Sequence, residues 1–388
     1  MNVYVLSIDA LGIGATKDYR NYDETNRDAN TLERISASYP DGKINHIRNL
    51  VNKGRNNERI NYYNGKKYIS GYLELGYLGA DSYIGHQAMM GRVIKEPIRV
   101  FLEDICDNLI RLIKEEYPSY EIRYENGLLF VSDKFILGNN AESDLGLNLN
   151  LLALKKEIDF DELKKFAGLI RENSDFERII CMYNNDIDLS LLYKCINTEE
   201  VNGRVITRFR VAPLNLYNEN YKVYHWCKQT DNTLVKLLKK NVEVNLVGKT
   251  ADMFDNEKFK KHWFSSIDET FNFISNSIKQ QDDSKDRLFF INLQEIDLCG
   301  HAKDLNGGVE ALVKINDNIN NIISEINEDE CLIITADHGN DPLITPNHTR
   351  ENVPYLLFGK DSVLSKSAYP NGGFELSYIS EIIMKVLS

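Results

Sequence analysis

Proline is scarce in this chain, with 8 in 388 residues, and no stretch is rich in it. Long proline-rich linkers are therefore excluded. The six cysteines are scattered without a CxxC spacing, so we predict reduced thiols. No apolar run approaches the roughly 20 residues that cross a membrane. The opening MNVYVLSIDALGIG has neither a basic leader nor an apolar run ending in a cleavage site, so we expect a cytoplasmic protein without a membrane partner.

The chain also lacks an excess of basic residues. Lys and Arg number 46 against 58 Asp and Glu, which gives a formal net charge of -12. Binding to a phosphate backbone needs a basic surface, so nucleic acid is excluded as a main partner. A small phosphorylated substrate is not excluded, because a few Lys or Arg beside bound cations can hold one. With 43% hydrophobic and 27% charged residues, the composition is that of a globular protein with two domains or one large domain with an insertion.

Short apolar runs recur along the chain, and each ends at a polar residue. NVYVLSID ends at Asp9, VEVNLVGK at Lys249, RLFFINLQEID at Asp297, and ECLIITADH at Asp337 and His338. Such runs predict buried parallel strands, and helical stretches such as DNTLVKLLKK lie between them. This alternation predicts an α/β fold with a doubly wound, mostly parallel sheet. Ligands bind beyond the carboxyl ends of such strands, where these polar residues lie.

The middle of the chain lacks this rhythm. Between residues 101 and 221, helix candidates such as LEDICDNLIRLIKEEY mix with strand-like pieces such as GLLFVSD and NGRVITRFRV. We interpret this region as a smaller α+β cap domain inserted into the core. The predicted division is a core made of residues 1–100 and 222–388, with residues 101–221 as the cap.

Aspartate and histidine, both metal-ligand types, gather at the predicted strand ends. TADHGNDPLITPNHTRE holds Asp337, His338 and His348, which cannot complete a site alone. DLCGH adds Asp297 and His301, four residues apart, which could face one site from a short turn. Taken singly, a helix N-cap would explain the aspartate after the first strand, and a solvent-facing turn would explain DLCGH. Together, six ligands suit two ions with three protein ligands each: Asp9, Asp297, His301, Asp337, His338 and His348.

The adjacent pair Asp337 and His338 needs a local explanation, because neighbouring residues on a strand point to opposite sides. They can serve one ion only where the strand ends and the backbone turns, and Gly339 is predicted to permit that turn. Mixed nitrogen and oxygen ligation without thiolate fits Mn²⁺ or Zn²⁺ better than Ca²⁺. Paired metals about 3.5–4 Å apart clamp a phosphoryl group during displacement. The sequence therefore predicts a two-metal site for phosphoryl transfer.

GADSYIGHQAMMGR supplies a candidate nucleophile. Ser82 follows Asp81 and precedes a predicted helix start at IGHQAMMG. A hydroxyl at a helix N-terminus between two cations would have a lowered pKa and could attack phosphorus. The alternative is a Ser N-cap, the commoner role of an isolated Ser in this position. A structural role equally explains His86, which is not assigned as a ligand.

Several motifs resemble those of the phosphopentomutase family, a member of the alkaline phosphatase superfamily. They are LSIDALGIGA, ANTLERI, GHQAMMG, VGKTADMF and, most specifically, TADHGNDP followed by NHTRENVPYLL. The resemblance runs from Asn2 to about Gly359. It implies an alkaline-phosphatase-like core, a cap inserted after the nucleophile helix, two Mn²⁺ ions and a phosphorylated Thr or Ser. It also implies interconversion of ribose 1-phosphate and ribose 5-phosphate, including the 2-deoxy forms.

The resemblance also implies roles for single residues by motif position. Ser82 would bridge the two ions as the phosphoryl carrier. One ion would be held by Asp9, Asp337 and His338, and the other by Asp297, His301 and His348. By the same resemblance, the phosphorylated serine would donate its phosphoryl group to a sugar phosphate. A sugar bisphosphate intermediate would then return its other phosphoryl group, while cap closure excludes water.

Substrate contacts are implied in the same way. Lys249 in VGKTADMF matches a family lysine that contacts substrate. The cap segment NGRVITRF is similar to the family's GRVIARPF, which implies that Arg204 or Arg208 grips a phosphate as a bidentate guanidinium. Ser132 and Asp133 in FVSDKF match, across a gap, a cap Ser/Asp pair that contacts the sugar.

The segment around the candidate nucleophile departs from the family's GKDTxTGHWEMMG pattern. Ser82 replaces a Thr, Ala80 replaces a Lys, and Gln87 and Ala88 replace Trp and Glu. DLCGH is one residue shorter than the family's DMLYGH and is similar to the spacing in cofactor-independent phosphoglycerate mutase. The metal ligands are complete while the substrate pocket differs. Alternatives therefore remain: a mutase for another sugar phosphate, a metal-dependent phosphatase, or a non-catalytic binding protein.

Overall fold

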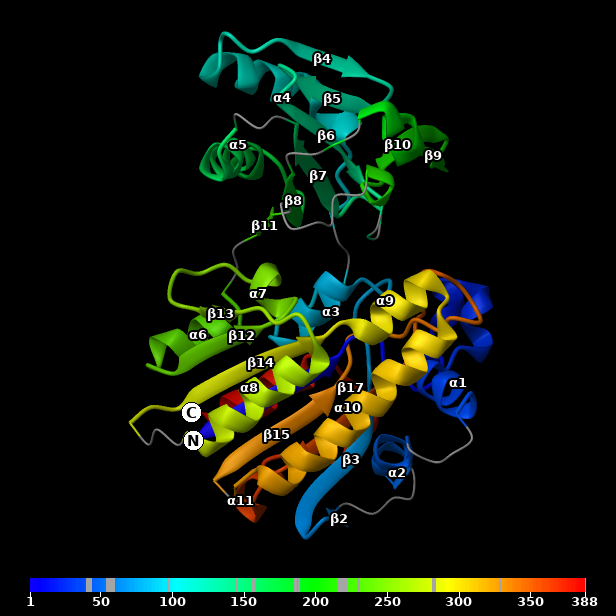
Figure 1. Ribbon diagram of the computed structural model, residues 1–388, viewed down its shortest axis with the longest axis vertical. Coiled ribbons are helices and arrows are strands. Elements are labelled where there is room, and N and C mark those ends of the chain that lie inside the picture. Colours follow the sequence, from blue (N-terminus) through cyan, green and yellow to red (C-terminus); the bar gives the residue numbers. More distant parts are fainter. Residues whose placement is uncertain are drawn as a thin grey trace. The chain divides into compact units, whose positions relative to one another are not determined.

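The computed structural model describes residues 1–39, 44–53, 60–95, 98–141, 143, 145–154, 158–184, 187, 189–214, 222–228, 231–280, 284–327 and 329–387. The chain divides into two compact units (Figure 1). The first comprises Met1–Glu96 and Thr230–Ser388, and the second comprises Pro97–Gln229. The chain thus leaves the first unit once and returns to it once.

The first unit is built on one sheet with the strand order β13-β12-β14-β1-β15-β16-β3-β17, and β2 pairs with β3. The strands from β13 to β15 in this order are parallel, whereas β16 runs antiparallel to both of its neighbours. The predicted α/β fold with a mostly parallel sheet is confirmed. The strands are β1 (Asn2–Ile8), β2 (Asn61–Tyr63), β3 (Lys66–Glu74), β12 (Glu243–Val247), β13 (Lys260–His262), β14 (Arg287–Leu293), β15 (Glu330–Thr335), β16 (Val353–Phe358) and β17 (Asn371–Glu375).

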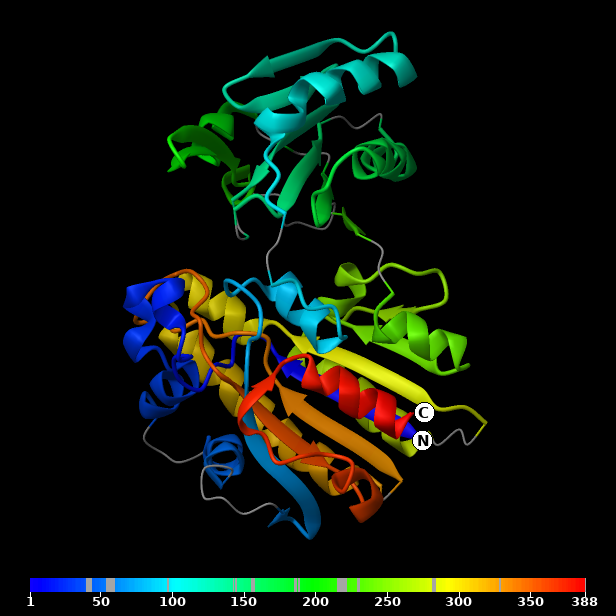
Figure 2. The same cartoon turned by 180° about the vertical axis from the view of Figure 1, so that it is seen from behind.

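Helices cover both faces of this sheet. α8 and α10 pack against each other on one face, and α12 packs with α3 and α6 on the other (Figures 1 and 2). The helices of the first unit are α1 (Thr31–Ala37), α2 (Asn45–Lys53), α3 (Ser82–Met89), α6 (Thr233–Lys239), α7 (Thr250–Met253), α8 (Ile267–Lys279), α9 (Glu295–Ala302), α10 (Leu305–Glu325), α11 (Asp361–Leu364) and α12 (Tyr378–Val386).

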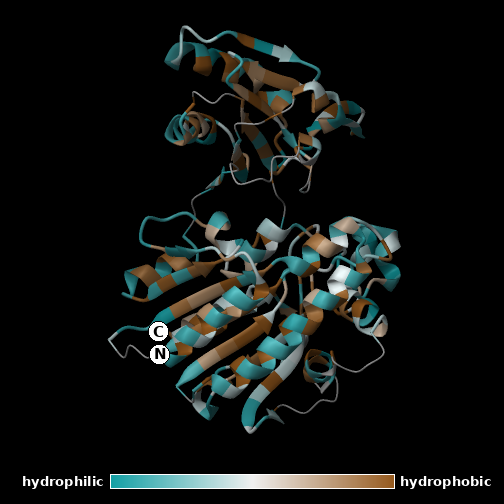
Figure 3. Ribbon diagram, in the orientation of Figure 1, coloured by the Kyte–Doolittle hydropathy of each residue, from teal (hydrophilic) through white to brown (hydrophobic). Residues whose placement is uncertain are grey.

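The central strands are apolar along nearly their whole length because both of their faces are covered. Every residue of β1, β15 and β16 is buried. Figure 3 shows β14 and β15 largely in brown, while α8 and α10 carry teal positions between brown ones. On α10 the buried side chains Leu312, Ile315, Ile319 and Ile322 recur every three or four residues, which is the spacing of one helix face. Burial of such faces on both sides of the sheet holds the first unit together.

The parallel strands end at one edge of the sheet. Ile8, the last residue of β1, pairs with Leu293 at the end of β14, and Ser7 pairs with Thr335 at the end of β15. Val247, at the end of β12, pairs with Ile291. The residues that follow these four strands therefore emerge side by side.

The second unit contains a mixed sheet with the order β11-β8-β7-β6-β10-β9, in which β5 pairs with β6 and β4 pairs with β5. α4 and α5 contribute to one buried apolar cluster with these strands. The unit extends beyond the expected boundary at residue 221, because β11 pairs antiparallel with β8. Its elements are α4 (Leu102–Glu116), β4 (Ile122–Glu125), β5 (Leu128–Val131), β6 (Phe135–Asn140), β7 (Asn148–Ala153), α5 (Phe160–Glu172), β8 (Arg178–Tyr183), β9 (Ile196–Val201), β10 (Arg204–Phe209) and β11 (Lys222–Cys227).

Among the residues that the structure describes, no helix combines the length and the apolar character needed to cross a bilayer.

Candidate metal centre

Two groups of metal-ligand side chains meet beyond the carboxyl ends of the core strands. The first group is Asp9, Asp337 and His338, and the second is Asp297, His301 and His348. Within each group, one ligand atom of every side chain lies within 4.8 Å of the others. Each group thus has the composition and spacing to hold one cation.

The two groups adjoin. The rings of His338 in the first group and His348 in the second are stacked, with centroids 3.9 Å apart. Lys249 provides a second connection, because its Nζ lies 2.9 Å from Oδ2 of Asp9 and 3.3 Å from Oδ2 of Asp297. Two cations held here would be neighbours, which is the arrangement of two-metal phosphoryl-transfer sites.

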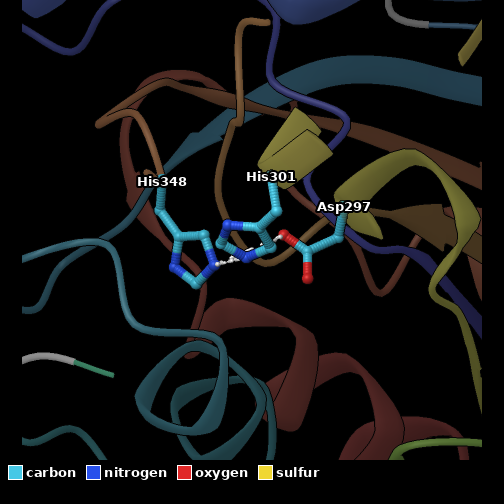
Figure 4. A group of neighbouring side chains, drawn as sticks. All are labelled: Asp297, His301 and His348. Carbon is cyan, nitrogen blue, oxygen red and sulfur yellow. Dashed lines mark hydrogen bonds and ion pairs between the residues drawn. The ribbon is translucent and has the colours of Figure 1, made fainter. Parts of the chain in front are cut away.

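Asp297 and His301 lie on α9, in place of the short turn expected for DLCGH (Figure 4). Residues four apart on a helix share one face, so both side chains reach the second group from one rigid element. Gly300 on the same helix allows close packing, because a Cβ there would lie 2.4 Å from Cγ of Asn340. Asn340 in turn donates from Nδ2 to Oδ1 of Asp297 at 3.3 Å.

Each of the three histidines is oriented through its Nδ1 atom. His301 Nδ1 lies 2.7 Å from the carbonyl oxygen of Pro346, His348 Nδ1 lies 2.6 Å from that of Ala80, and His338 Nδ1 lies 3.0 Å from that of Gly339. A carbonyl can only accept, so each Nδ1 carries the proton, and in the neutral ring Nε2 keeps its lone pair. Metal-ligating histidines have this same pattern.

The Nε2 lone pairs of these histidines are positioned to bind cations. Nε2 of His301 and Nε2 of His348 face each other at 3.1 Å, and Oδ1 of Asp297 lies 3.4 Å and 3.3 Å from them (Figure 4). Two facing lone pairs beside a carboxylate repel one another unless a positive charge lies among them. Nε2 of buried His338 lies 3.1 Å from Oδ2 of Asp337 and 3.5 Å from Oδ1 of Asp9, so the same three atoms could share one cation.

Gly339 contributes to the site by leaving space for a neighbouring side chain, and not by the turn that was expected. It does not adopt a left-handed conformation, and it pairs with Thr349 in an antiparallel bridge. Its lack of a side chain matters because a Cβ would lie 2.2 Å from Oε1 of Glu351. The buried Glu351 carboxylate accepts from Thr31 Oγ1 and Thr349 Oγ1, both at 2.7 Å, and from the backbone N–H of Gly14 at 3.1 Å. This carboxylate joins the segments that carry Asp9, His338 and His348.

Ser82 is the first residue of α3, and its hydroxyl is directed at the first group. Asp81 is the N-cap, since its side chain accepts from the backbone N–H of Ile84. Ser82 is therefore not the cap, and its Oγ donates to Oδ2 of Asp337 at 2.7 Å and lies 3.5 Å from Oδ1 of Asp9. A hydroxyl at a helix N-terminus beside a cation site is placed for activation as a nucleophile.

Two buried residues that the sequence reasoning did not assign connect Ser82 to the first group. His86 Nδ1 lies 2.8 Å from the carbonyl oxygen of Ser82 and 3.3 Å from Oδ2 of Asp337. The Nδ2 amide of Asn292 donates to His86 Nε2 and to Oδ2 of Asp9, both at 3.0 Å. A polar residue inside the apolar run RLFFINL was the available signal for Asn292.

Burial and close charges shape the electrostatics of the first group. Burial and the nearby Asp337 carboxylate raise the pKa of Asp9 to about 6, against the opposing effect of Lys249. Burial lowers the pKa of His338, but Asp337 and Asp9 outweigh it and raise that pKa to about 10. Several carboxylates buried together require compensating positive charge, so protons and cations compete for the same positions.

The candidate substrate residues of the second unit make local contacts. Arg204 pairs with Asp104 at 2.7 Å. Arg208 pairs with Glu199 at 3.0 Å and donates to the carbonyl oxygens of residues 140 and 143. Ser132 and Asp133 form the turn between β5 and β6, both with positive φ, and Ser132 Oγ accepts from the backbone N–H of residue 121 at 2.8 Å. Their substrate contacts stay predictions.

Comparison with known proteins identifies the family. Residues 1–387 match the model of the Metalloenzyme superfamily. The chain belongs to this superfamily. The predicted metal-dependent class of enzyme is thereby confirmed, and the two candidate metal groups agree with it.

Curated relatives match over nearly the whole chain. A phosphopentomutase of Clostridium tetani is 27% identical over 398 residues, covering 97% of this chain and 90% of the relative. A phosphopentomutase of Clostridium beijerinckii is 26% identical over 385 residues, covering 92% and 87%. The predicted relation to the phosphopentomutase family is confirmed by these relatives.

Solved structures of low sequence identity also match. The PH0037 protein of Pyrococcus horikoshii is 12% identical with a TM-score of 0.45, covering 99% of this chain and 96% of that one. A phosphoglycerate mutase of Leishmania mexicana is 13% identical with a TM-score of 0.44, covering 99% and 95%. These likenesses concern the fold alone.

Proposed function

We propose that the chain is a phosphosugar mutase that interconverts ribose 1-phosphate and ribose 5-phosphate, or their 2-deoxy forms. The relatives that match over nearly its whole length carry the name phosphopentomutase. The observation that carries the proposal is the position of Ser82. Its hydroxyl contacts the first metal group, and two residues earlier the carbonyl of Ala80 binds His348 of the second. A phosphoryl group on this hydroxyl would adjoin both groups.

The two groups would hold two divalent cations, for which we propose Mn²⁺. Nitrogen and oxygen ligands without thiolate support this choice. When bound, the cations would supply neutralisation of the phosphoryl oxygens and a lower pKa for an attached hydroxyl. Asp9, Asp337 and His338 would form one ligand set, and Asp297, His301 and His348 the other.

The remaining chemistry belongs to the chain's own residues. Phosphorylated Ser82 would give its phosphoryl group to a free hydroxyl of the sugar phosphate. The P–O bond to Oγ breaks, a P–O bond to the sugar oxygen forms, and the proton of the sugar hydroxyl ends on Oγ. The resulting bisphosphate would return its other phosphoryl group to Oγ and leave as the isomeric monophosphate. Asp337 Oδ2, 2.7 Å from Oγ, orients the hydroxyl between these steps.

The test is an assay with Mn²⁺, ribose 1-phosphate and a trace of a ribose bisphosphate, followed by phosphorus NMR. Appearance of the ribose 5-phosphate resonance is the expected result. Inorganic phosphate without the isomer would show a phosphatase instead. No change would show that this sugar phosphate is not the substrate, and other sugar phosphates would then be assayed in the same way.

A further inference from the structure

We infer that Lys249 is a positioning residue that holds one carboxylate of each metal group in place, an inference that rests on the proposed two-metal function. Its ammonium contacts Oδ2 of Asp9 at 2.9 Å and Oδ2 of Asp297 at 3.3 Å. Both carboxylates are buried, whereas the lysine side chain is 24% exposed. Among the described residues, Lys249 is the one cationic Lys or Arg side chain that forms ion pairs with both groups.

The backbone that carries Lys249 is braced against the sheet. Gly248 has a φ of +70°, and a Cβ there would lie 2.6 Å from the carbonyl oxygen of Asn292. Thr250 on the other side accepts from the backbone N–H of Val247 at 3.0 Å and donates to the carbonyl oxygen of Phe290 at 2.8 Å. A side chain that starts from a fixed backbone loses less freedom on forming its contacts, so it can hold other groups in place.

The two carboxylates divide their oxygens in the same way. Oδ1 of Asp297 lies 3.4 Å from Nε2 of His301 and 3.3 Å from Nε2 of His348, while its Oδ2 faces Lys249. Oδ1 of Asp9 lies 3.5 Å from Nε2 of His338, while its Oδ2 faces Lys249. Each carboxylate thus turns one oxygen to its own histidines and the other to the shared ammonium. Lys249 therefore fixes the orientation of both carboxylates and the spacing between the two ligand groups.

This role differs from a contact with substrate. An ammonium has three N–H donors, and the two carboxylates take two of them. The third is available for a phosphate oxygen, so a substrate contact and the positioning role are compatible. The two roles separate experimentally, because positioning acts on the metal pair in the absence of substrate and a substrate contact does not.

The decisive experiment compares Lys249→Met with the unmodified chain, both without substrate. Mn²⁺ binding is measured by titration calorimetry, and the coupling between the two ions by electron paramagnetic resonance. We expect Lys249→Met to bind the weaker of its two ions roughly 10- to 100-fold less tightly than the unmodified chain does. Losses of this size are typical when a residue that orients metal ligands is removed. The spin coupling should change as the carboxylates reorient. Lys249→Arg should preserve most of both, because its guanidinium can reach two carboxylates.

Lys258→Met, on an exposed position beyond α7, is the matched control and should change neither quantity. Unchanged or tighter binding together with an unchanged spectrum in Lys249→Met would overturn the inference and leave the proposed function standing. If the unmodified chain takes up no metal pair, the proposed function and the inference both fail. Circular dichroism of the Lys249→Met protein confirms that a changed affinity does not reflect unfolding.

Discussion

Oγ of Ser82 donates a hydrogen bond to Oδ2 of Asp337 across 2.7 Å. Replacing Ser82 with Ala removes the hydroxyl that the proposal assigns as the phosphoryl carrier. Mutase activity should fall on the order of 10⁴-fold or more, as expected when a nucleophile is lost. Metal content should stay at two ions, because none of the six ligands changes. Steady-state kinetics and elemental analysis of the same protein batch measure the two quantities.

Ser82→Thr is the matched control, because a threonine hydroxyl can also accept phosphate. It should keep measurable activity and should acquire label from a radioactive bisphosphate, whereas Ser82→Ala should not. Activity in Ser82→Ala within tenfold of the unmodified chain would refute the nucleophile assignment.

His86 contacts the backbone carbonyl of Ser82, and the contacts of its two ring nitrogens can be tested separately. Asn in place of His86 retains a donor near the Nδ1 position, while Gln retains a polar group near the Nε2 position. Because Nδ1 contacts the Ser82 carbonyl and Asp337, we expect His86→Gln to lower kcat more than His86→Asn does. A loss of about 10- to 100-fold is typical for residues that orient metal ligands. If kcat is the same in both variants and only KM changes, His86 does not position the serine.

Each metal group should bind its ion separately. Asp297→Ala removes a ligand of the second group only, so we expect the metal content to drop from two ions to one. Chelation of the unmodified chain should lower its melting temperature, because cations that bind only the folded state stabilise it. Asp107→Asn, an exposed carboxylate on α4, is the control and should retain both ions. Retention of two tight ions by Asp297→Ala would contradict the division into groups.

Glu351 should give the stability of the fold a measurable pH dependence. Burial raises the pKa of Glu351 above its usual value, despite hydrogen bonds from Thr349 and Thr31. A raised folded-state pKa means that the folded chain binds this proton more tightly than the unfolded chain does. The contribution of Glu351 to stability is therefore complete below the unfolded value of about 4.5 and is lost as the pH rises through the folded pKa.

Urea unfolding between pH 4 and pH 8 checks this sign. The free energy of unfolding of Glu351→Gln should rise relative to that of the unmodified chain as the pH increases, because the amide does not ionise. A difference that is flat with pH, or that falls, would show that the carboxylate is stabilised in its charged form.

The core sheet could be predicted because each of its central strands is a continuous, mostly apolar stretch of the sequence. Asp9 follows the seven buried, mostly apolar residues of β1, and Asp337 follows shortly after the similar run of β15, so parallel strands bring both to one edge. Asp297 was placed on a turn instead of a helix, since the five residues DLCGH are too few to show helical periodicity. Gly339 was predicted to be a turn residue. Its actual role is to leave room for Glu351, which lies twelve residues further along the chain and so gives no local signal.

The residues behind the ligands could not be predicted in the same way. Asn292 and His86 act through contacts 206 residues apart in the chain, and neither has a spacing that distinguishes it from a buried polar residue. Their roles depend on side-chain direction at the end of a strand and on the first turn of a helix. Only the three-dimensional structure supplies that information.

The pairing of β1 has a consequence for how the protein is made. Asn2 pairs with Arg287 on one side and with Glu330 on the other, so β1 is made before both of its partner strands and waits for the earlier of them while about 290 residues follow. At about 5–20 residues per second, this wait lasts roughly 15–60 s. The second unit has its contacts within residues 97–229 and can form during that time. The apolar VYVLSI segment, which ends just before Asp9, lacks its partner strands during this time, and unpaired apolar strands are prone to aggregation.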